Sequence, residues 1–347
     1  MAMTKYLLAV PLVALVAACG GNGSSGATSG SQLKIVGSST VYPFTTAVSE
    51  EFQRANPGSS AIVESTGTGA GIKLFCSGVG SQFPDMVNAS REIKASEYAD
   101  CVKAGAKNVI ELPIGIDGLT LIQAKGQPAL NLTTADIYKA LAANPFGKPN
   151  TAKTWQDVNP ALPAIKIRVF GPPPTSGTRD SLAELILTAG CESDPAMKQL
   201  KKTDEAKQKD ICTKIREDGV FVEAGENDNL LVQKVSADPG SLGVLGFSFL
   251  DENLDRVAPV SIGGTAPTEV TISDLSYPGS RKLYIYIKGE HLAAKPAIRQ
   301  FITAYAKLIG KGGVLEKRGL VPFSGTDLSD ATAQAAALSP LDPAALD

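Results

Sequence analysis

The chain has 347 residues, 43% hydrophobic and 20% charged, which is enough apolar material for about two domains with substantial cores. Lysine and arginine total 33 and aspartate and glutamate 35, and a net charge of −2 argues against a general nucleic-acid-binding surface. The single histidine, His291, argues against multi-histidine metal sites and most histidine-based acid–base catalysis. We therefore expect no metal, no cofactor and no nucleic-acid partner.

The first 18 residues have the pattern of a secretory signal peptide. A basic residue precedes the apolar run Tyr6–Ala18, which is too short to span a bilayer comfortably. The block Val16–Cys19 resembles a bacterial lipobox, whose cysteine receives lipid; ordinary cleavage that leaves a free Cys19 is the alternative. Residues 19–32 are therefore predicted to be a lipidated cysteine followed by a flexible Gly/Ser-rich tether.

The cysteine count agrees with export. Apart from Cys19 the chain has four cysteines, which allow three pairings, and exported proteins favour disulfides. We expect Cys76–Cys101 and Cys191–Cys212, because each bridge closes a loop of modest length within one predicted lobe. Four free buried thiols are the alternative, whereas a zinc site is discounted because paired C-x-x-C spacing is missing.

Strand and helix signals alternate along the rest of the chain. Short apolar runs predict strands at Leu33–Val36, Ala61–Val63, Asp85–Val87, Val109–Ile114, Leu119–Ala124, Ile165–Phe170, Val220–Val222 and Leu283–Ile287. Helical spacing predicts helices at Phe44–Phe52, Gly67–Phe75, Glu97–Ala104, Thr133–Leu141, Leu182–Ala189, Leu230–Val235 and Pro296–Ile309, and Leu242–Leu250 continues the alternation. This order predicts α/β lobes with mainly parallel sheets. Residues 331–347, rich in alanine with two prolines, are expected to form a loose tail.

In three places a strand gives way to a Gly/Ser/Thr cluster that opens a helix: Gly37–Thr40, Gly67–Gly71 and Ser176–Thr178. The first turn of a helix has unpaired N–H groups and a positive dipole end, and hydroxyls add further donors. Such turns lie at the carboxyl ends of strands, where ligands bind in open α/β sheets. One cluster alone is usually a helix cap, but three together indicate an anion site made of neutral dipoles. Nucleotide binding has no support, since G-x-G-x-x-G and G-x-x-x-x-G-K-[ST] are absent.

Two arginines strengthen the case for an anion. Arg179 directly follows the third cluster, and Arg91 follows Asn88–Ser90 just after a predicted strand. Either guanidinium suits a bidentate contact to a tetrahedral oxyanion. A surface or interlobe ion pair is the alternative for each.

The order of these motifs resembles the phosphate-binding proteins of bacterial high-affinity phosphate ABC transporters. The similarity covers residues 33–323 and rests on Gly37–Pro43, Gly67–Gly71, Asn88–Arg91, Ser176–Arg179, Asn227–Asn229, Gly240–Gly243 and Tyr277–Tyr286. It implies a type II periplasmic-binding-protein fold, with a ligand cleft between two lobes. Crossover strands are expected near Pro113–Gly118 and Leu275–Tyr284. Lobe 1 is then residues 33–113 plus 285–330, and lobe 2 is residues 114–284.

The resemblance also implies a set of phosphate-binding groups from both lobes. They are Ser39, Thr40 and the Val41 N–H in the first turn, Thr68 in the second, Ser90 and Arg91 in the third, and Ser176, Gly177, Thr178 and Arg179 in the second lobe.

Two positions depart from the family pattern. Arg91 stands where some members have an aspartate that accepts the proton of hydrogen phosphate, and Pro172 stands where some have an arginine. Arg179 is the candidate for the displaced positive charge. Asp117, in a predicted crossover, and Asp228 are candidates for the missing acidic group, and each also suits a local turn or cap. A buried carboxylate accepts a proton from phosphate and repels sulfate, so these departures bear on selectivity.

The resulting prediction is an exported solute-binding protein rather than an enzyme. We expect a monomer in the periplasm or cell envelope, held to a membrane by its lipid anchor, that captures phosphate and delivers it to an ABC permease in the inner membrane. Arsenate, sulfate or a phosphorylated small molecule are alternative ligands, and an envelope scaffold or sensor is an alternative role. An exported serine hydrolase is disfavoured, because His291 lies in a polar stretch and G-x-S-x-G is absent.

Overall fold

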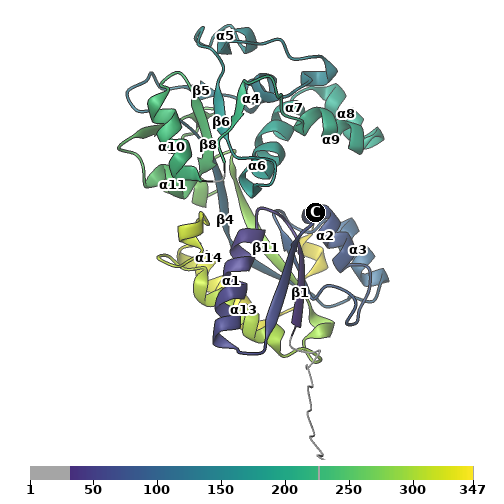
Figure 1. The fold of residues 1–347 in the computed structure, drawn as a ribbon. Helices are drawn as coiled ribbons and strands as arrows, with labels where there is room; N and C mark the ends of the chain where they lie inside the picture. Colours follow the sequence, from purple (N-terminus) through teal and green to yellow (C-terminus); the bar gives the residue numbers. More distant parts are fainter. Residues whose placement is uncertain (1–31, 226, 347) are drawn as a thin grey trace, which may run out of the picture.

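The computed structural model describes residues 32–225 and 227–346, which form two lobes joined by long strands (Figure 1). The predicted signal peptide, Cys19 and the tether up to residue 31 lie outside the described residues. Gln32, placed at the end of the predicted tether, instead begins the first strand and pairs with Ser60. Within the described residues, no helix has the length and apolar character needed to cross a membrane.

Lobe 1 opens with alternating strands and helices that follow the predicted order. They are β1 (Gln32–Gly37), α1 (Tyr42–Ala55), β2 (Ser60–Ser65), α2 (Thr68–Phe75), β3 (Met86–Ala89) and α3 (Ala95–Lys103). The end of the chain adds η3 (Gly289–His291), α13 (Ala297–Leu308), η4 (Glu316–Arg318), α14 (Gly325–Ala337) and η5 (Pro343–Ala345). The predicted apolar face of α1 packs on α13, where the rings of Phe52 and Phe301 meet edge to face at 5.4 Å. Because β2 and β3 both run parallel to β1, the turns that follow these strands emerge at one edge.

Lobe 2 contains the middle of the chain. Its first half has β5 (Asn131–Leu132), α4 (Thr134–Leu141), η1 (Pro145–Gly147), α5 (Trp155–Val158), β6 (Val169–Gly171), α6 (Gly177–Ser181), the π-helical segment η2 (Leu182–Leu187) and α7 (Thr188–Cys191). Its second half has α8 (Pro195–Thr203), α9 (Glu205–Thr213), β7 (Phe221–Glu223), α10 (Asp228–Ala237), β8 (Leu242–Gly246), α11 (Phe247–Asp251), β9 (Val257–Pro259), β10 (Ser261–Ile262) and α12 (Glu269–Ser273). The predicted start of α4 is confirmed, since Thr133 and Asp136 form a capping box.

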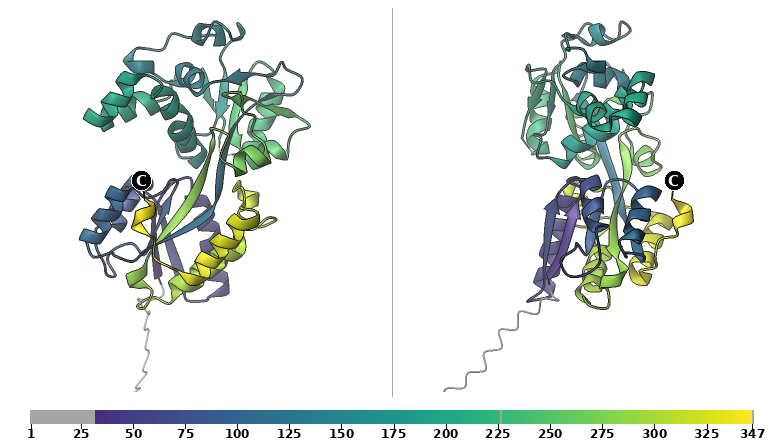
Figure 2. Two further views of the ribbon diagram at one scale, coloured as in Figure 1. Left: turned by 180° about the vertical axis from the view of Figure 1, so that it is seen from behind. Right: turned by 90° about the vertical axis from the view of Figure 1, so that its right-hand side faces the viewer.

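Two long strands, β4 (Val109–Ala124) and β11 (Ser280–Lys288), run between the lobes (Figure 2). They pair antiparallel from Val109 opposite Lys288 to Gly118 opposite Ser280, and beyond Gly118 strand β4 pairs with β8 and β9 of lobe 2. The prediction of two separate strands in residues 109–124 is wrong, because residues 115–118 continue the pairing with β11. A bulge at Leu283/Tyr284 absorbs the irregularity there.

Nine of the described strands form a mixed sheet in the order β2-β1-β3-β11-β4-β8-β6-β7, with β9 beside β4, and β5 and β10 pair in a separate two-stranded sheet. Each lobe keeps parallel pairs in a set of three strands, and in each set the earliest strand lies between the other two: β2-β1-β3 in lobe 1 and β7-β6-β8 in lobe 2. The pairs that involve β4 and β11 are antiparallel because these strands carry the chain across in opposite directions. The expected mainly parallel arrangement therefore holds within each lobe but not at the crossover.

The C-terminal segment is packed on lobe 1, so the prediction of a loose tail is wrong for residues 331–346. Ala331 is fully buried in α14, which lies against α13 and β4. The Gln334 side chain donates to the Glu111 carbonyl at 3.0 Å, and the Leu341 N–H donates to the Val109 carbonyl at 2.8 Å. Small alanine side chains allow this close packing, and Leu341 joins an apolar cluster of the lobe.

The four cysteines form the two predicted disulfides, Cys76–Cys101 and Cys191–Cys212. The first joins the end of α2 to α3 in lobe 1. The second joins α7 to α9 in lobe 2 and closes the α8–α9 hairpin at its base. The alternatives of free thiols and of a four-cysteine zinc site are thereby excluded.

Replacing both Cys191 and Cys212 by alanine should lower the free energy of unfolding by about 3 kcal/mol, because the bridge restricts a loop of 21 residues in the unfolded chain. Chemical denaturation of both proteins under non-reducing conditions measures the difference. An unchanged denaturation midpoint would show that this bridge does not stabilise the fold.

Candidate functional site

Three turns of lobe 1 are locked together at the carboxyl ends of β1 and β3. Gly37 has a φ of 126°, and a Cβ at this position would lie 2.1 Å from the Asn88 carbonyl oxygen, so only glycine fits. Its carbonyl accepts hydrogen bonds from the N–H groups of Thr66 (2.9 Å) and Gly67 (2.8 Å). The Ser38 N–H donates to the Asn88 carbonyl at 2.9 Å. These bonds hold the beginnings of α1 and α2 beside the segment that follows β3.

The second and third turns bring Thr68 and Ser90 into direct contact. Their hydroxyl oxygens lie 2.9 Å apart, and the Ser90 N–H donates to Thr68 Oγ1 at 3.1 Å. Both side chains are buried within lobe 1, yet both line a cavity between the lobes. Two predicted binding hydroxyls, 22 residues apart in the chain, therefore belong to one surface.

The turn before α6 in lobe 2 meets the first turn of lobe 1. Ser176 caps α6 by accepting a hydrogen bond from the Thr178 N–H at 3.2 Å. A Cβ on Gly177 would lie 2.6 Å from Thr40 Cα, so the two backbones approach as only glycine allows. Thr40 Oγ1 donates to the Gly177 carbonyl at 3.2 Å. Hence the Gly37–Thr40 and Ser176–Thr178 clusters face each other across the lobes.

A second interlobe contact lies beside the first. Ser39 Oγ donates to the carboxylate of Asp180 in α6. Burial raises the pKa of Asp180 above its usual value, although the Ser39 hydrogen bond acts in the opposite direction. The predicted Val41 N–H is less accessible, since Val41 is fully buried and this N–H points to Ser38 Oγ at 3.4 Å.

Arg281 of β11 connects both lobes and the crossover strands, with only 11% of its side chain exposed. Its Nε donates to Asp117 on the neighbouring strand β4 at 3.2 Å. Its Nη2 donates to Thr40 of lobe 1 at 3.1 Å and to Ser181 of lobe 2 at 2.9 Å. Its Nη1 donates to Glu184 of lobe 2 at 2.5 Å. One guanidinium therefore holds polar groups from every part of the cleft.

A cavity of about 840 Å³ opens between the lobes beside Arg281. Its walls include Thr68, Ser90 and Arg91 of lobe 1 and Glu184 of lobe 2. Six of the side chains that line it are lysine or arginine and three are glutamate. This excess of positive charge, together with the hydroxyl donors, favours an anion.

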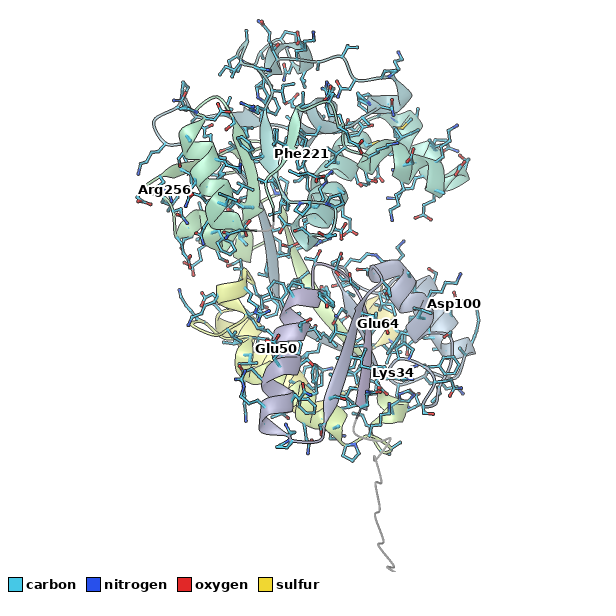
Figure 3. The ribbon with its side chains drawn as sticks, in the orientation of Figure 1. Lys34, Glu50, Glu64, Asp100, Phe221 and Arg256 are labelled. Atoms are coloured by element: carbon cyan, nitrogen blue, oxygen red, sulfur yellow. A yellow bond between two sulfur atoms is a disulfide. The ribbon has the colours of Figure 1, made fainter. Side chains whose placement is uncertain are left out.

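The two arginines predicted as anion ligands already have partners. Arg91 lines the cavity but forms a bidentate ion pair with Glu97 at 2.8 and 2.9 Å, a hydrogen-bonded contact that raises the pKa of Arg91. Arg179 donates to the Pro172 carbonyl at 3.1 Å, and its guanidinium stacks 4.3 Å from the ring of Phe221, labelled in Figure 3. Burial lowers the pKa of Arg179. Its guanidinium is thus held within lobe 2.

The two candidate acidic groups lie in different settings. Asp117 belongs to the cleft, where its carboxylate accepts hydrogen bonds from Ser181 at 2.7 Å and from Arg281. Asp228 lies in the first turn of α10 in lobe 2, and burial raises its pKa to about 7. Its carboxylate forms no ion pair with the described residues of the cleft.

Sequence reasoning missed four residues of the site: Asp180, Ser181, Glu184 and Arg281. Arg281 falls within the predicted crossover Leu275–Tyr284 and within the family motif Tyr277–Tyr286, but neither singles out its side chain. Its importance comes from strand register, which places it opposite Asp117 although 164 residues separate them. Glu184 was seen only as part of a helix with an apolar face.

His291 lies at the opposite end of β3 from the cleft. Its Nδ1 is 2.7 Å from the fully buried carboxylate of Asp85, which also pairs with Lys295 at 2.9 Å. Its Nε2 accepts the Gly80 N–H at 3.0 Å. Burial opposes the charged form of Asp85, but the hydrogen bonds from His291 and Lys295 hold its pKa below the usual value. Both ring nitrogens are engaged, so His291 cannot serve as the base of a serine hydrolase in the cleft.

The residues 32–225 and 227–346 contain no cluster of three or more His, Cys, Asp or Glu side chains suited to a metal ion.

Comparison with known proteins assigns the family. Residues 22–306 match the family described as a PBP superfamily domain. The chain belongs to the PBP superfamily. Protein SphX of Synechococcus elongatus is 35% identical over 305 residues, which cover 85% of this chain and 79% of that protein. The phosphate-binding protein PstS of Staphylococcus saprophyticus is 29% identical over 322 residues, which cover 91% of this chain and 88% of that protein.

A solved structure supports the same assignment. The crystal structure of a possible phosphate-binding protein from Planctomyces limnophilus has a TM-score of 0.70 and 27% identity, and the match covers 88% of this PBP superfamily chain and 98% of that one. The resemblance to phosphate-binding proteins and the two-lobed fold are therefore confirmed. The expectation of a binding protein rather than an enzyme is confirmed by the same relatives.

Replacing Gly177 by alanine should push the lobes apart, because the new Cβ would lie 2.6 Å from Thr40 Cα. Small-angle X-ray scattering should then show a larger radius of gyration than for the unmodified protein. Gly240→Ala is the matched control, since a Cβ there meets only Ile165 of the same lobe, at 3.9 Å. Equal radii for both variants would contradict the tight interlobe contact.

Proposed function

We propose that this protein binds inorganic phosphate in the cleft between its lobes and delivers it to an ABC permease. One observation carries the proposal: hydroxyl groups from both lobes converge around Arg281 at the edge of a cavity. Relatives named phosphate-binding protein PstS support phosphate as the ligand.

The ligand groups are assigned by their place at the cavity and at the interlobe contact. Thr68 and Ser90 offer hydroxyls on the lobe 1 wall, and Thr40 offers a third beside Arg281. In this proposal the Ser176–Thr178 turn, which meets Thr40 across the lobes, supplies the donors of lobe 2. Neutral donors such as these bind a dehydrated oxyanion without a full counter-charge. Arg281 then supplies the charge-assisted contact that the sequence assigned to Arg91 or Arg179.

The two crossover strands give the proposed cycle its hinge. Strands β4 and β11 connect the lobes, and closure about them brings the donors of both lobes onto the anion. In this proposal the closed monomer docks on a permease in the inner membrane. The predicted lipid anchor on Cys19 keeps the local concentration of the protein high in the cell envelope.

A titration series of phosphate, arsenate and sulfate by calorimetry tests the choice of anion. Phosphate and arsenate should bind, and sulfate should bind more weakly, because Asp117 and Asp180 place carboxylates beside the site that repel an anion without a proton. Heat from sulfate alone, or none from any of the three, would refute phosphate binding.

Thr68→Val should weaken phosphate binding by about tenfold or more, because a hydroxyl that hydrogen-bonds a charged ligand is lost without a change in shape. Thr303→Val is the matched control, since Thr303 is an exposed residue of α13. If both variants bind phosphate equally well, Thr68 is not a ligand.

Arg281→Lys should weaken phosphate binding by about tenfold, because lysine keeps the charge but loses the fork that holds four partners at once. Arg179→Lys should change the affinity by less than about twofold, because the Arg179 guanidinium is held on the ring of Phe221 and not at the ligand. If Arg179→Lys weakens phosphate binding more than Arg281→Lys does, the charged contact to phosphate comes from Arg179.

A further inference from the structure

A carboxylate of lobe 2 lies where the proposed ligand would meet lobe 1. Glu184, on the π-helical segment η2, lines the cavity with 48% of its side chain exposed. A single oxygen, Oε2, accepts from Arg281 Nη1 at 2.5 Å and from Ser90 Oγ at 3.4 Å. Ser90 is in turn bonded to Thr68. This oxygen therefore accepts hydrogen bonds from the same guanidinium and hydroxyl groups that would bind an oxyanion.

The other carboxylate on Arg281 is held in a different way. Asp117 stands opposite Arg281 in the register of β4 and β11, so their ion pair is fixed within the connecting strands. It is also better covered, with 16% of its side chain exposed. Glu184 comes from lobe 2 and reaches Ser90 of lobe 1, so its contacts depend on the approach of the lobes. Of the two carboxylates, Glu184 is the one that an anion in the cavity can displace.

The balance of charges around Arg281 also indicates that Glu184 is the residue that an anion would displace. Among the described residues, Arg281 is paired with both Asp117 and Glu184, so its positive charge is already more than neutralised. A phosphate added to this arrangement would face two carboxylates across one guanidinium. Displacing Glu184 into water removes one of them, and its half-exposed side chain can make that movement without unpacking a core.

We propose that Glu184 is an internal anion, which competes with the ligand for Arg281 and Ser90 and thereby sets the affinity of the cleft. The identity of the competing ligand rests on the proposed phosphate function. Because the ligand binds only when these donors are free, the apparent affinity falls by the fraction of molecules in which Glu184 occupies them. The competition acts on negative charge, so it applies equally to phosphate, arsenate and sulfate.

Glu184→Gln tests this role because it keeps the size of the side chain and removes its charge. Calorimetry should show phosphate, arsenate and sulfate each bound about tenfold more tightly than by the unmodified protein, since the ion pair with Arg281 is replaced by a hydrogen bond to an uncharged amide oxygen. Glu205→Gln is the matched control, as Glu205 lines the same cavity but its carboxylate forms no hydrogen bond or ion pair with the described residues. It should change the affinity by less than about twofold.

Two binding results would overturn the proposal. Unchanged or weaker binding of all three anions by Glu184→Gln would show that Glu184 does not compete. Weaker phosphate binding with tighter sulfate binding would make Glu184 the acceptor of the ligand's proton, which is the opposite role.

A second measurement needs no ligand. In phosphate-free buffer, small-angle scattering should find Glu184→Gln more open than the unmodified protein and than Glu205→Gln, because the bridge from η2 to Ser90 is weakened. If the unmodified protein binds none of the anions, the proposed function fails. The scattering result then decides the Glu184 contact by itself: a larger radius of gyration supports it, and an equal radius overturns it.

Discussion

The geometry of the cleft depends on the Arg281 guanidinium, which donates to Asp117, Thr40, Ser181 and Glu184. Arg281 sits on a crossover strand, and so it can reach groups of both lobes. A planar fork with donors on several sides suits this task, whereas an ammonium group could not hold such a set in fixed directions. The cost of burying the charge is offset by two carboxylates and two hydroxyls.

Around this charge, the site is made mostly of neutral groups on rigid supports. Gly37 and Gly177 let backbones approach more closely than any side chain would permit, so turns from different parts of the chain share one surface. The hydroxyls of Thr68 and Ser90 are fixed by their contact with each other. In the proposed function, donors held in this way need little reorganisation when the anion binds, and this favours strong binding by dipoles. The same rigidity leaves Glu184 as the adjustable group.

Much of the fold could be predicted because its signals are local. The apolar spacing of Phe44, Val48 and Phe52 requires a helix with one buried face, and the capping box at Thr133 fixes where α4 begins. The predictions that were wrong concern segments whose structure depends on residues far away in the chain. The alanine-rich segment after Ala331 has little apolar bulk, and only its fit against α13 and β4 shows that it is packed. Likewise, the glycines at 115 and 118 suggested a break between two strands, but both pair with β11, so β4 is continuous there.

By itself, the sequence determined the alternating α/β order, the two disulfides and the polar turns that converge on the cleft. These follow from periodicity, cysteine spacing and helix-start chemistry, which act over a few neighbouring residues. Only the tertiary structure decided which charged groups enter the cleft. Arg179 stacks on Phe221 and Arg91 pairs with Glu97, whereas Arg281 lies between the lobes and pairs with Asp117. A charged side chain is long and pairs with whatever opposite charge folding brings near, and that neighbour is set by strand register and lobe packing rather than by adjacent residues.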